Sequence, residues 1–331
     1  MPRLRYRGSL AILLCVALSA CGRAGSPESS LEVATHGVHA AAISRDGTMA
    51  AVGSLTQGAS LWKLDTRERR FDWNHRSAAR SVVTAVALSP EGGVAATAEG
   101  STLVLWDTHT GAALRYFSAP SELLSVALTR GGELALLGLQ DGTALLVDAR
   151  AGGVKRRFGH EGSVLAVAID PAGTRALTGS ADGSARLWDT RSGTRLQRWE
   201  LGAEVEVLAL SDDGTRVFST ARRAPSRVLD ADSGQTLAQL PAYASRVLRG
   251  ESYSAGAFSG DGASLLLGTV DGRVLLWDTV SARLLETWKL PRRGAWRAAG
   301  NRVIAVSVDA AGLYVASGDG FIHRLRRPSA R

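Results

Sequence analysis

The sequence predicts an all-β protein in which seven four-stranded sheets surround one axis, a seven-bladed β-propeller. Three observations support this prediction. A segment of about 40 to 50 residues recurs seven times, apolar and alternating strand patterns follow one another within each copy, and Asp-Gly pairs separate the strands. The 331 residues alone would suggest about two domains of roughly 100 to 200 residues each, but the repeat indicates a single ring from about 31 to 327.

The first 20 residues have the features of an export signal. Arg3, Arg5 and Arg7 precede an apolar run that ends at Ala20. The run Leu10 to Ala20 is too short to span a bilayer, which requires about 20 residues. We therefore expect residues 1–20 to be removed, which lowers the net charge from +8 to 8 − 3, or +5.

The end of this segment, Leu18-Ser19-Ala20-Cys21, resembles the lipobox of bacterial lipoproteins. The resemblance implies that Cys21 becomes the first residue and carries acyl chains such as palmitate, which anchor the protein to a membrane. Gly22 stands where an inner-membrane retention signal usually has Asp, which favours the outer membrane, facing the periplasm. Cys15 would leave with the signal, so no disulfide is expected. The alternative is an ordinary apolar N-terminus with a chance cysteine.

Residues 21–30 are expected to form the lipidated cysteine and a flexible tether, because Gly22 to Ser30 is rich in Gly, Ser and Pro. Residues 328–331 are expected to form a short C-terminal tail.

The repeat is defined by a turn glycine and an apolar or Trp-Asp pair about 15 residues later. Successive glycines are 45, 40, 41, 41, 48 and 50 residues apart. The turn glycines are Gly47, Gly92, Gly132, Gly173, Gly214, Gly262 and Gly312, and the matching ends are Trp62, Trp106, Val147, Trp188, Leu229, Trp277 and Arg324.

These residues resemble the Trp-Asp (WD) repeat family over nearly the whole length from Leu31 to Arg327. The motif is strongest in the second, fourth and sixth copies, each of which ends in Leu-Trp-Asp-Thr. Elsewhere it weakens, since Val147-Asp148 and Leu229-Asp230 lack the Trp. The resemblance implies a propeller that serves as a scaffold for other proteins.

Strand chemistry supports the same architecture. Val164 to Ile169 is continuously apolar, as expected for an inner strand that is covered on both faces. Asp-Gly pairs provide the positive φ angles that tight hairpins need. These pairs are Asp141-Gly142, Asp182-Gly183, Asp271-Gly272 and Asp319-Gly320.

Ring closure requires one additional strand, because the seventh copy runs out after Phe321 to Leu325. A strand-like stretch from Leu31 to Thr35 precedes the first copy. We expect it to pair beside Phe321 to Leu325 as the outer strand of the last blade.

Four side chains of the fourth copy, His160, Thr178, Asp182 and Trp188, have the composition of a catalytic triad with a neighbour. The family resemblance implies a structural tetrad instead, in which the imidazole links the carboxylate to the hydroxyl and the hydroxyl meets the indole N–H. Only the fourth copy is expected to hold all four members. No catalytic residues are therefore assigned.

Neither a metal nor a cofactor is expected. Among six histidines only His36 and His39 are close in sequence, and phosphate loops and nucleophile elbows are absent. The basic excess is spread along the chain, which argues against nucleic acid as a partner.

Three loops near the C-terminal half are rich in arginine, with 8 arginines in 31 residues and Glu251 as the only acid. Arginine and aromatic residues are enriched at binding hot spots, so we expect one loop face to bind a partner. The alternative is that these loops are solvated. The expected binding residues are Arg222, Arg223, Tyr243, Arg246, Arg249, Tyr253, Arg292, Arg293, Trp296 and Arg297.

The sequence thus favours a non-catalytic lipoprotein scaffold for an unidentified envelope protein. A propeller enzyme or small-ligand binder that uses the central funnel is the alternative. A subunit of outer-membrane assembly machinery is a variant of the first hypothesis, but the known lipoprotein of that kind has eight blades, and seven copies argue against equivalence.

Overall fold

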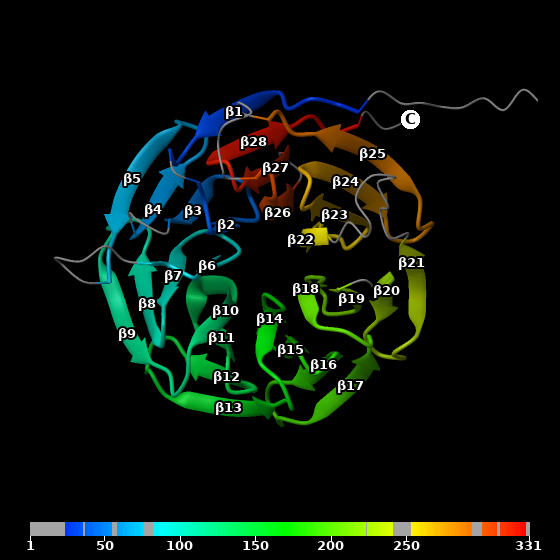
Figure 1. The fold of residues 1–331 in the computed structure, drawn as a ribbon. Coiled ribbons are helices and arrows are strands. Elements are labelled where there is room, and N and C mark those ends of the chain that lie inside the picture. Colours follow the sequence, from blue (N-terminus) through cyan, green and yellow to red (C-terminus); the bar gives the residue numbers. More distant parts are fainter. Residues whose placement is uncertain are drawn as a thin grey trace, which may run out of the picture.

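The computed structural model describes residues 24–35, 37–54, 58–75, 82–222, 224–240, 253–292, 300–309 and 312–328. They form seven antiparallel four-stranded sheets around a central opening (Figure 1), which confirms the predicted all-β, seven-bladed propeller. One short 3-10 turn, η1 (Arg130–Gly132), interrupts the strands of this part of the chain.

In blades 1 to 6 the strands run from the axis outward in chain order, and in blade 7 the outermost strand is the N-terminal β1. Blade 1 contains β2 (Ala40–Ile43), β3 (Met49–Ser54), β4 (Gly58–Lys63) and β5 (Glu68–Trp73). Blade 2 contains β6 (Ala85–Leu88), β7 (Val94–Glu99), β8 (Thr102–Asp107) and β9 (Ala113–Ser118). Blade 3 contains β10 (Leu123–Leu128), β11 (Leu134–Leu139), β12 (Thr143–Asp148) and β13 (Val154–Gly159). Blade 4 contains β14 (Val164–Ile169), β15 (Arg175–Ser180), β16 (Ser184–Asp189) and β17 (Arg195–Glu200). Blade 5 contains β18 (Val205–Leu210), β19 (Arg216–Ala221), β20 (Ser226–Asp230) and β21 (Thr236–Leu240). Blade 6 contains β22 (Tyr253–Phe258), β23 (Ser264–Thr269), β24 (Arg273–Asp278) and β25 (Leu284–Lys289), and blade 7 contains β26 (Val303–Asp309), β27 (Gly312–Ser317), β28 (Phe321–Leu325) and β1 (Ser29–Glu32).

The core lies between neighbouring blades, because a single four-stranded sheet cannot bury both of its faces. Leu177 and Leu187 of blade 4 are fully buried and belong to one cluster with Val205 and Leu229 of blade 5. Replacing such a leucine with alanine costs about 2 to 5 kcal/mol. Each blade therefore depends on its neighbours for stability.

The aspartate of the Trp-Asp pair caps the turn between the third and fourth strands. In blade 4 the Asp189 carboxylate accepts hydrogen bonds from the backbone N–H and the hydroxyl of Ser192 (2.6 and 2.8 Å), and these bonds hold the pKa of Asp189 below its usual value. Asp148 and Asp230 make the same backbone bonds in blades 3 and 5, which lack the tryptophan. In these two blades the aspartate persists where the tryptophan does not.

The ring closes as the sequence predicted. Strand β1 pairs antiparallel with β28, in the register Ser29↔Arg324 to Glu32↔Phe321, although β1 begins two residues before the expected Leu31. Arg67 of blade 1 also donates a hydrogen bond to the carbonyl of Ser30 (2.6 Å). The first strand therefore joins the last blade to the first.

The structure corrects the alignment of the seventh copy. Equivalent inner pairs, Val164↔Ser180 and Val303↔Ser317, place Leu325 and not Arg324 at the position of Trp188. Leu325 is buried, whereas Arg324 is exposed. The assignment of Gly312 as a turn glycine was wrong for the same reason: it begins β27 and lacks the positive φ of the other six turn glycines.

The predicted tether is shorter than expected. Gly25 donates its N–H to the carbonyl of Thr287 (2.9 Å) and accepts a hydrogen bond from the N–H of Lys289 (3.1 Å) at the outer strand of blade 6. Residues 24–30 therefore lie against the propeller. Cys21 and the predicted signal peptide lie outside the described residues. Within the described part of the chain, no helix is long and apolar enough to cross a membrane.

Candidate functional site: one mouth of the central channel

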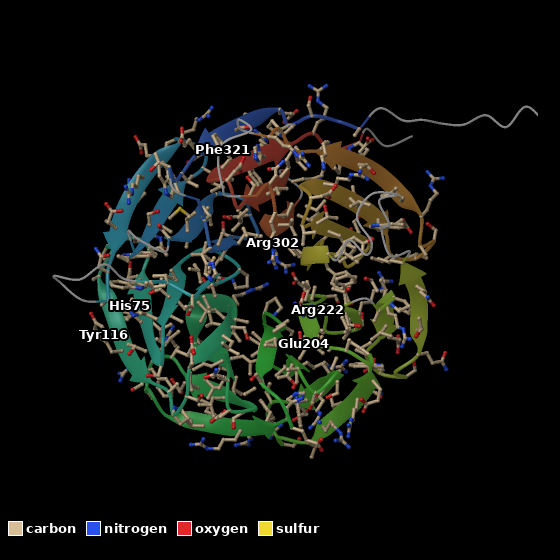
Figure 2. All side chains as sticks on the ribbon, viewed as in Figure 1. His75, Tyr116, Glu204, Arg222, Arg302 and Phe321 are labelled. Carbon is tan, nitrogen blue, oxygen red and sulfur yellow. The ribbon has the colours of Figure 1, made fainter. Side chains whose placement is uncertain are left out.

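The loops that join consecutive blades gather on one face of the ring, called the linker face below. On this face the central channel opens into a cavity of about 660 Å³. Figure 2 shows Glu204, Arg222 and Arg302 close to the axis. The lining residues come from blades 4 to 7 and are Ser163, Leu165, Ala181, Glu204, Glu206, Arg222, Val270 and Arg302.

Arg222 is held between two carboxylates. Its Nη1 lies 3.5 Å from Glu204 Oε2, and its Nε lies 3.3 Å from Glu206 Oε1. The backbone N–H of Arg222 also donates to the carbonyl of Glu204 (3.1 Å). These side chains remain partly exposed, so each pair contributes only about 0 to 1 kcal/mol to stability. Their arrangement presents both signs of charge at the mouth.

Sequence reasoning described this face as basic and missed its acids. Glu206 lies on the inner strand β18, and Glu204 immediately precedes it. The one feature of the sequence that could have indicated these acids is the charged residue Glu206 within the otherwise apolar run Val205-Glu206-Val207-Leu208. A charge in such a run is unusual, because both faces of an inner strand are otherwise covered by neighbouring blades.

The structure places three of the ten predicted binding residues. Arg222 lies at the mouth and Arg292 is exposed beyond β25. Tyr253 is 2% exposed and packs edge-on against Phe218 at 6.0 Å between ring centroids, so its assignment to a binding face was wrong. Tyr253 begins an inner strand, where an aromatic side chain fills the space between blades. The other seven residues, Arg223, Tyr243, Arg246, Arg249, Arg293, Trp296 and Arg297, lie outside the described residues.

The opposite mouth of the channel is crossed by an ion pair. Arg45 of blade 1 meets the Asp212 carboxylate of blade 5 beside a cavity of about 260 Å³ walled largely by apolar inner-strand residues. Burial raises the pKa of Asp212, and the charges of Arg45 and Arg130 oppose this rise. The pair joins non-adjacent blades, which narrows this end of the channel.

The four predicted tetrad residues form one hydrogen-bonded chain in blade 4. The indole N–H of Trp188 donates to Thr178 Oγ1 (2.9 Å), which lies 2.7 Å from His160 Nε2, and His160 Nδ1 lies 3.1 Å from Asp182 Oδ2. A neutral imidazole with its proton on Nδ1 satisfies all four groups.

The burial of this hydrogen-bonded network indicates a structural role and not a catalytic one. It lowers the pKa of His160, and the Arg186 charge adds to this effect. Burial would raise the pKa of Asp182, but hydrogen bonds from Ser184 outweigh it and hold that pKa far below its usual range. Thr178 is fully buried, so no substrate can reach its hydroxyl.

Blade 2 contains a second network of this kind, which the sequence analysis missed. His75 Nε2 lies 2.8 Å from Thr97 Oγ1, and the Trp106 indole donates to the same oxygen (2.8 Å). Glu99 replaces the aspartate, with its Oε2 3.8 Å from His75 Nδ1. Blade 2 therefore has three of the four members, and the distance between Glu99 and His75 is too long for a hydrogen bond, so the complete tetrad among the described residues is that of blade 4.

Blade 7 uses its histidine differently. His323 Nδ1 lies 2.8 Å from Ser30 Oγ of β1, and Nε2 lies 3.1 Å from Ser317 Oγ. Ser317 in turn donates to Asp319 (2.5 Å). Burial lowers the pKa of His323 to about 4, against an opposing effect of Asp319. This network connects the first strand of the propeller to the last.

Among the described residues, no group of three or more His, Cys, Asp or Glu side chains is placed to hold a metal ion.

One repeat of the chain matches a known family. Residues 152–189 match the family model described as WD domain, G-beta repeat. The matched stretch runs from just before β13 to the end of β16 and includes His160, Thr178, Asp182 and Trp188. No curated protein matches the chain.

Proposed function

We propose that this WD-repeat propeller is a non-catalytic, membrane-anchored scaffold that binds a protein partner at the channel mouth of its linker face. A WD-repeat propeller fits a protein-interaction scaffold in general. The anchor, the envelope location and the binding face are the specific parts of the proposal.

The charged mouth is the observation that carries the binding face. Arg222 lies between Glu204 and Glu206, Arg302 is exposed on the same rim, and Val270 beside them is 40% exposed. Mixed charges around an apolar side chain can select a partner through charge complementarity. Rigid strands hold these groups in place, which reduces the entropy lost on binding.

The sequence supports the anchor. Cys21 follows Leu18-Ser19-Ala20 at the end of a basic and apolar leader. We expect Cys21→Ala to move the protein from the membrane fraction to the soluble fraction. Unchanged retention in membranes would contradict the anchor without bearing on the binding face.

The binding face is tested by purifying the anchored protein in mild detergent after crosslinking, with mass spectrometry of accompanying proteins. A partner in near-equal amount should disappear when Glu204→Ala, Arg222→Ala and Arg302→Ala are combined. The matched control combines Arg198→Ala and Glu200→Ala, an exposed ion pair on the outer strand β17. The control should retain the partner.

A partner that survives the triple substitution would exclude this mouth as the binding face. If no partner accompanies either protein, a small ligand in the funnel becomes the better hypothesis. One observation favours this second candidate: the Arg45–Asp212 pair narrows the far end, so the channel is shaped like a funnel.

A further inference from the structure

The N-terminal segment is fixed to one side of the ring before it enters the propeller. Gly25 bridges to Trp288 on the outer strand of blade 6, and a Cβ atom on Gly25 would lie only 2.7 Å from the Trp288 ring. Only glycine allows this close contact. Figure 1 shows this segment running along the outside of the ring from β25 to β1.

Covalent length places the proposed anchor near the same rim. Cys21 and Ala24 are three residue steps apart, with Gly22 and Arg23 between them, and an extended chain of that length spans at most about 10 Å. The polar layer of a bilayer is roughly 5 to 8 Å thick on each side. If Cys21 is acylated, the outer wall of blade 6 must therefore lie close to the lipid headgroups.

Three apolar side chains are exposed on this wall, although the position of Leu285 is also apolar in blades 2, 4 and 5, where Leu114, Leu196 and Leu237 are 52%, 42% and 50% exposed. The position of the anchor and the turn residue Val280 distinguish blade 6. Val280, in the turn before β25, is 76% exposed, and the consecutive residues Leu284 and Leu285 are each 37% exposed. The corresponding turn positions of blades 1 to 5 are polar: Asp65, His109, Arg150, Arg191 and Asp232.

The charged residues of the blade 6 wall do not give it an attraction to the membrane. The described basic residues near this rim are Arg283, Lys289, Arg292, Arg324, Arg326 and Arg327, and the acids beside them are Glu28, Asp261, Asp271, Asp278 and Glu286. The near balance of the two signs gives little attraction to anionic lipids. The apolar side chains are the groups that would gain from contact with lipid.

We propose that the outer wall of blade 6, with Val280, Leu284 and Leu285 as its contact residues, rests on the membrane that holds the anchor. The inference depends on the acylation of Cys21 proposed above. In this orientation the ring stands on its edge, and the linker face opens sideways along the membrane surface.

The test places a photo-crosslinking amino acid at position 280 or 285 of the full chain, expressed in a bacterial host. The control positions are 114 and 116 on β9 of blade 2, where Leu114 and Tyr116 are 52% and 60% exposed. Figure 2 shows Tyr116 on the rim, across the ring from β25. After irradiation of intact membranes, mass spectrometry detects lipid adducts.

We expect lipid adducts at 280 and 285 in several-fold higher yield than at 114 and 116. Leu284→Asp should reduce the yield at 280 several-fold, because a carboxylate resists burial among lipids, whereas Leu114→Asp should not. High salt should leave the yield at 280 unchanged.

The two proposals fail in different ways. Equal yields on both rims in a protein that remains in the membrane fraction would overturn the orientation and leave the anchor intact. A protein that stays soluble irrespective of Cys21→Ala would overturn the anchor, and the orientation with it.

Discussion

At the scale of single residues, the hydroxyl of Thr178 connects two halves of a buried network. It accepts the Trp188 indole N–H and contacts His160, which contacts Asp182. Each neighbour depends on the next for its hydrogen bond, so removing one member leaves others without a partner.

We therefore expect Thr178→Val to lower the free energy of unfolding by about 1 to 3 kcal/mol, because buried polar groups lose their partners while the volume is kept. Urea denaturation measures this change. Thr236→Val, at an exposed threonine on β21, should change stability by less than about 0.5 kcal/mol. Equal effects of the two substitutions would show that the network adds no stability.

His323 predicts an acid sensitivity. Its pKa falls from the ordinary 6.5 to about 4 on folding. The unfolded state therefore binds a proton that the folded state does not between these values, so stability is complete above pH 6.5 and is lost as pH falls towards 4. The loss reaches about 3 kcal/mol, at 1.36 kcal/mol for each pH unit.

Urea midpoints between pH 7 and pH 4 test this prediction. His323→Gln should lower stability at pH 7 and flatten the pH dependence, since Ser30 and Ser317 no longer face a titrating ring. His109→Gln, at an exposed histidine, should leave the pH dependence as it is. A variant His323→Gln with the original slope would assign the acid sensitivity to other groups.

At the scale of strands and blades, β1 makes the strand pairing with the largest separation in sequence, because it pairs with β28 near the C-terminus. It covers the edge of β28, and an uncovered edge strand exposes backbone groups that favour aggregation. A chain that begins at Val33 should therefore melt several degrees lower than the full chain and elute as aggregates in gel filtration.

A chain that begins at Ala24 is the matched control, because it retains β1 and the Gly25 bridge. It should melt like the full chain. If both truncated chains melt alike, β1 contributes nothing to closure.

The repeat pattern was sufficient to predict the blades, because the first six copies have their own turn glycine and the second to sixth copies their own Asp cap. It was insufficient at the seventh copy, where Gly312 was aligned with the turn glycines although it begins a strand. It was also insufficient at blade 2, where His75, Thr97 and Trp106 form a partial network that the spacing did not indicate. A network of side chains depends on reach and angle, which spacing in sequence does not specify.

At the scale of the whole molecule, the binding face was the part least accessible to sequence reasoning. Counting arginines in loops identified Arg222, but its carboxylate neighbours come from β18 and the residue before it, and the pairing of β18 with β19 in blade 5 brings them together. Tyr253 was misplaced for the opposite reason, since its loop neighbours suggested exposure and the strand buries it.

The pairing of β1 with β28 also determines when the ring can close during synthesis. Ser30 and His323 are 293 residues apart, so at roughly 5 to 20 residues per second the ribosome makes the first partner about 15 to 60 s before the second. During that interval six blades can assemble in order, but the ring stays open between blade 1 and the unfinished blade 7. Any chain that ends early keeps β1 but lacks its partner β28, so the backbone groups of β1 stay uncovered and favour aggregation.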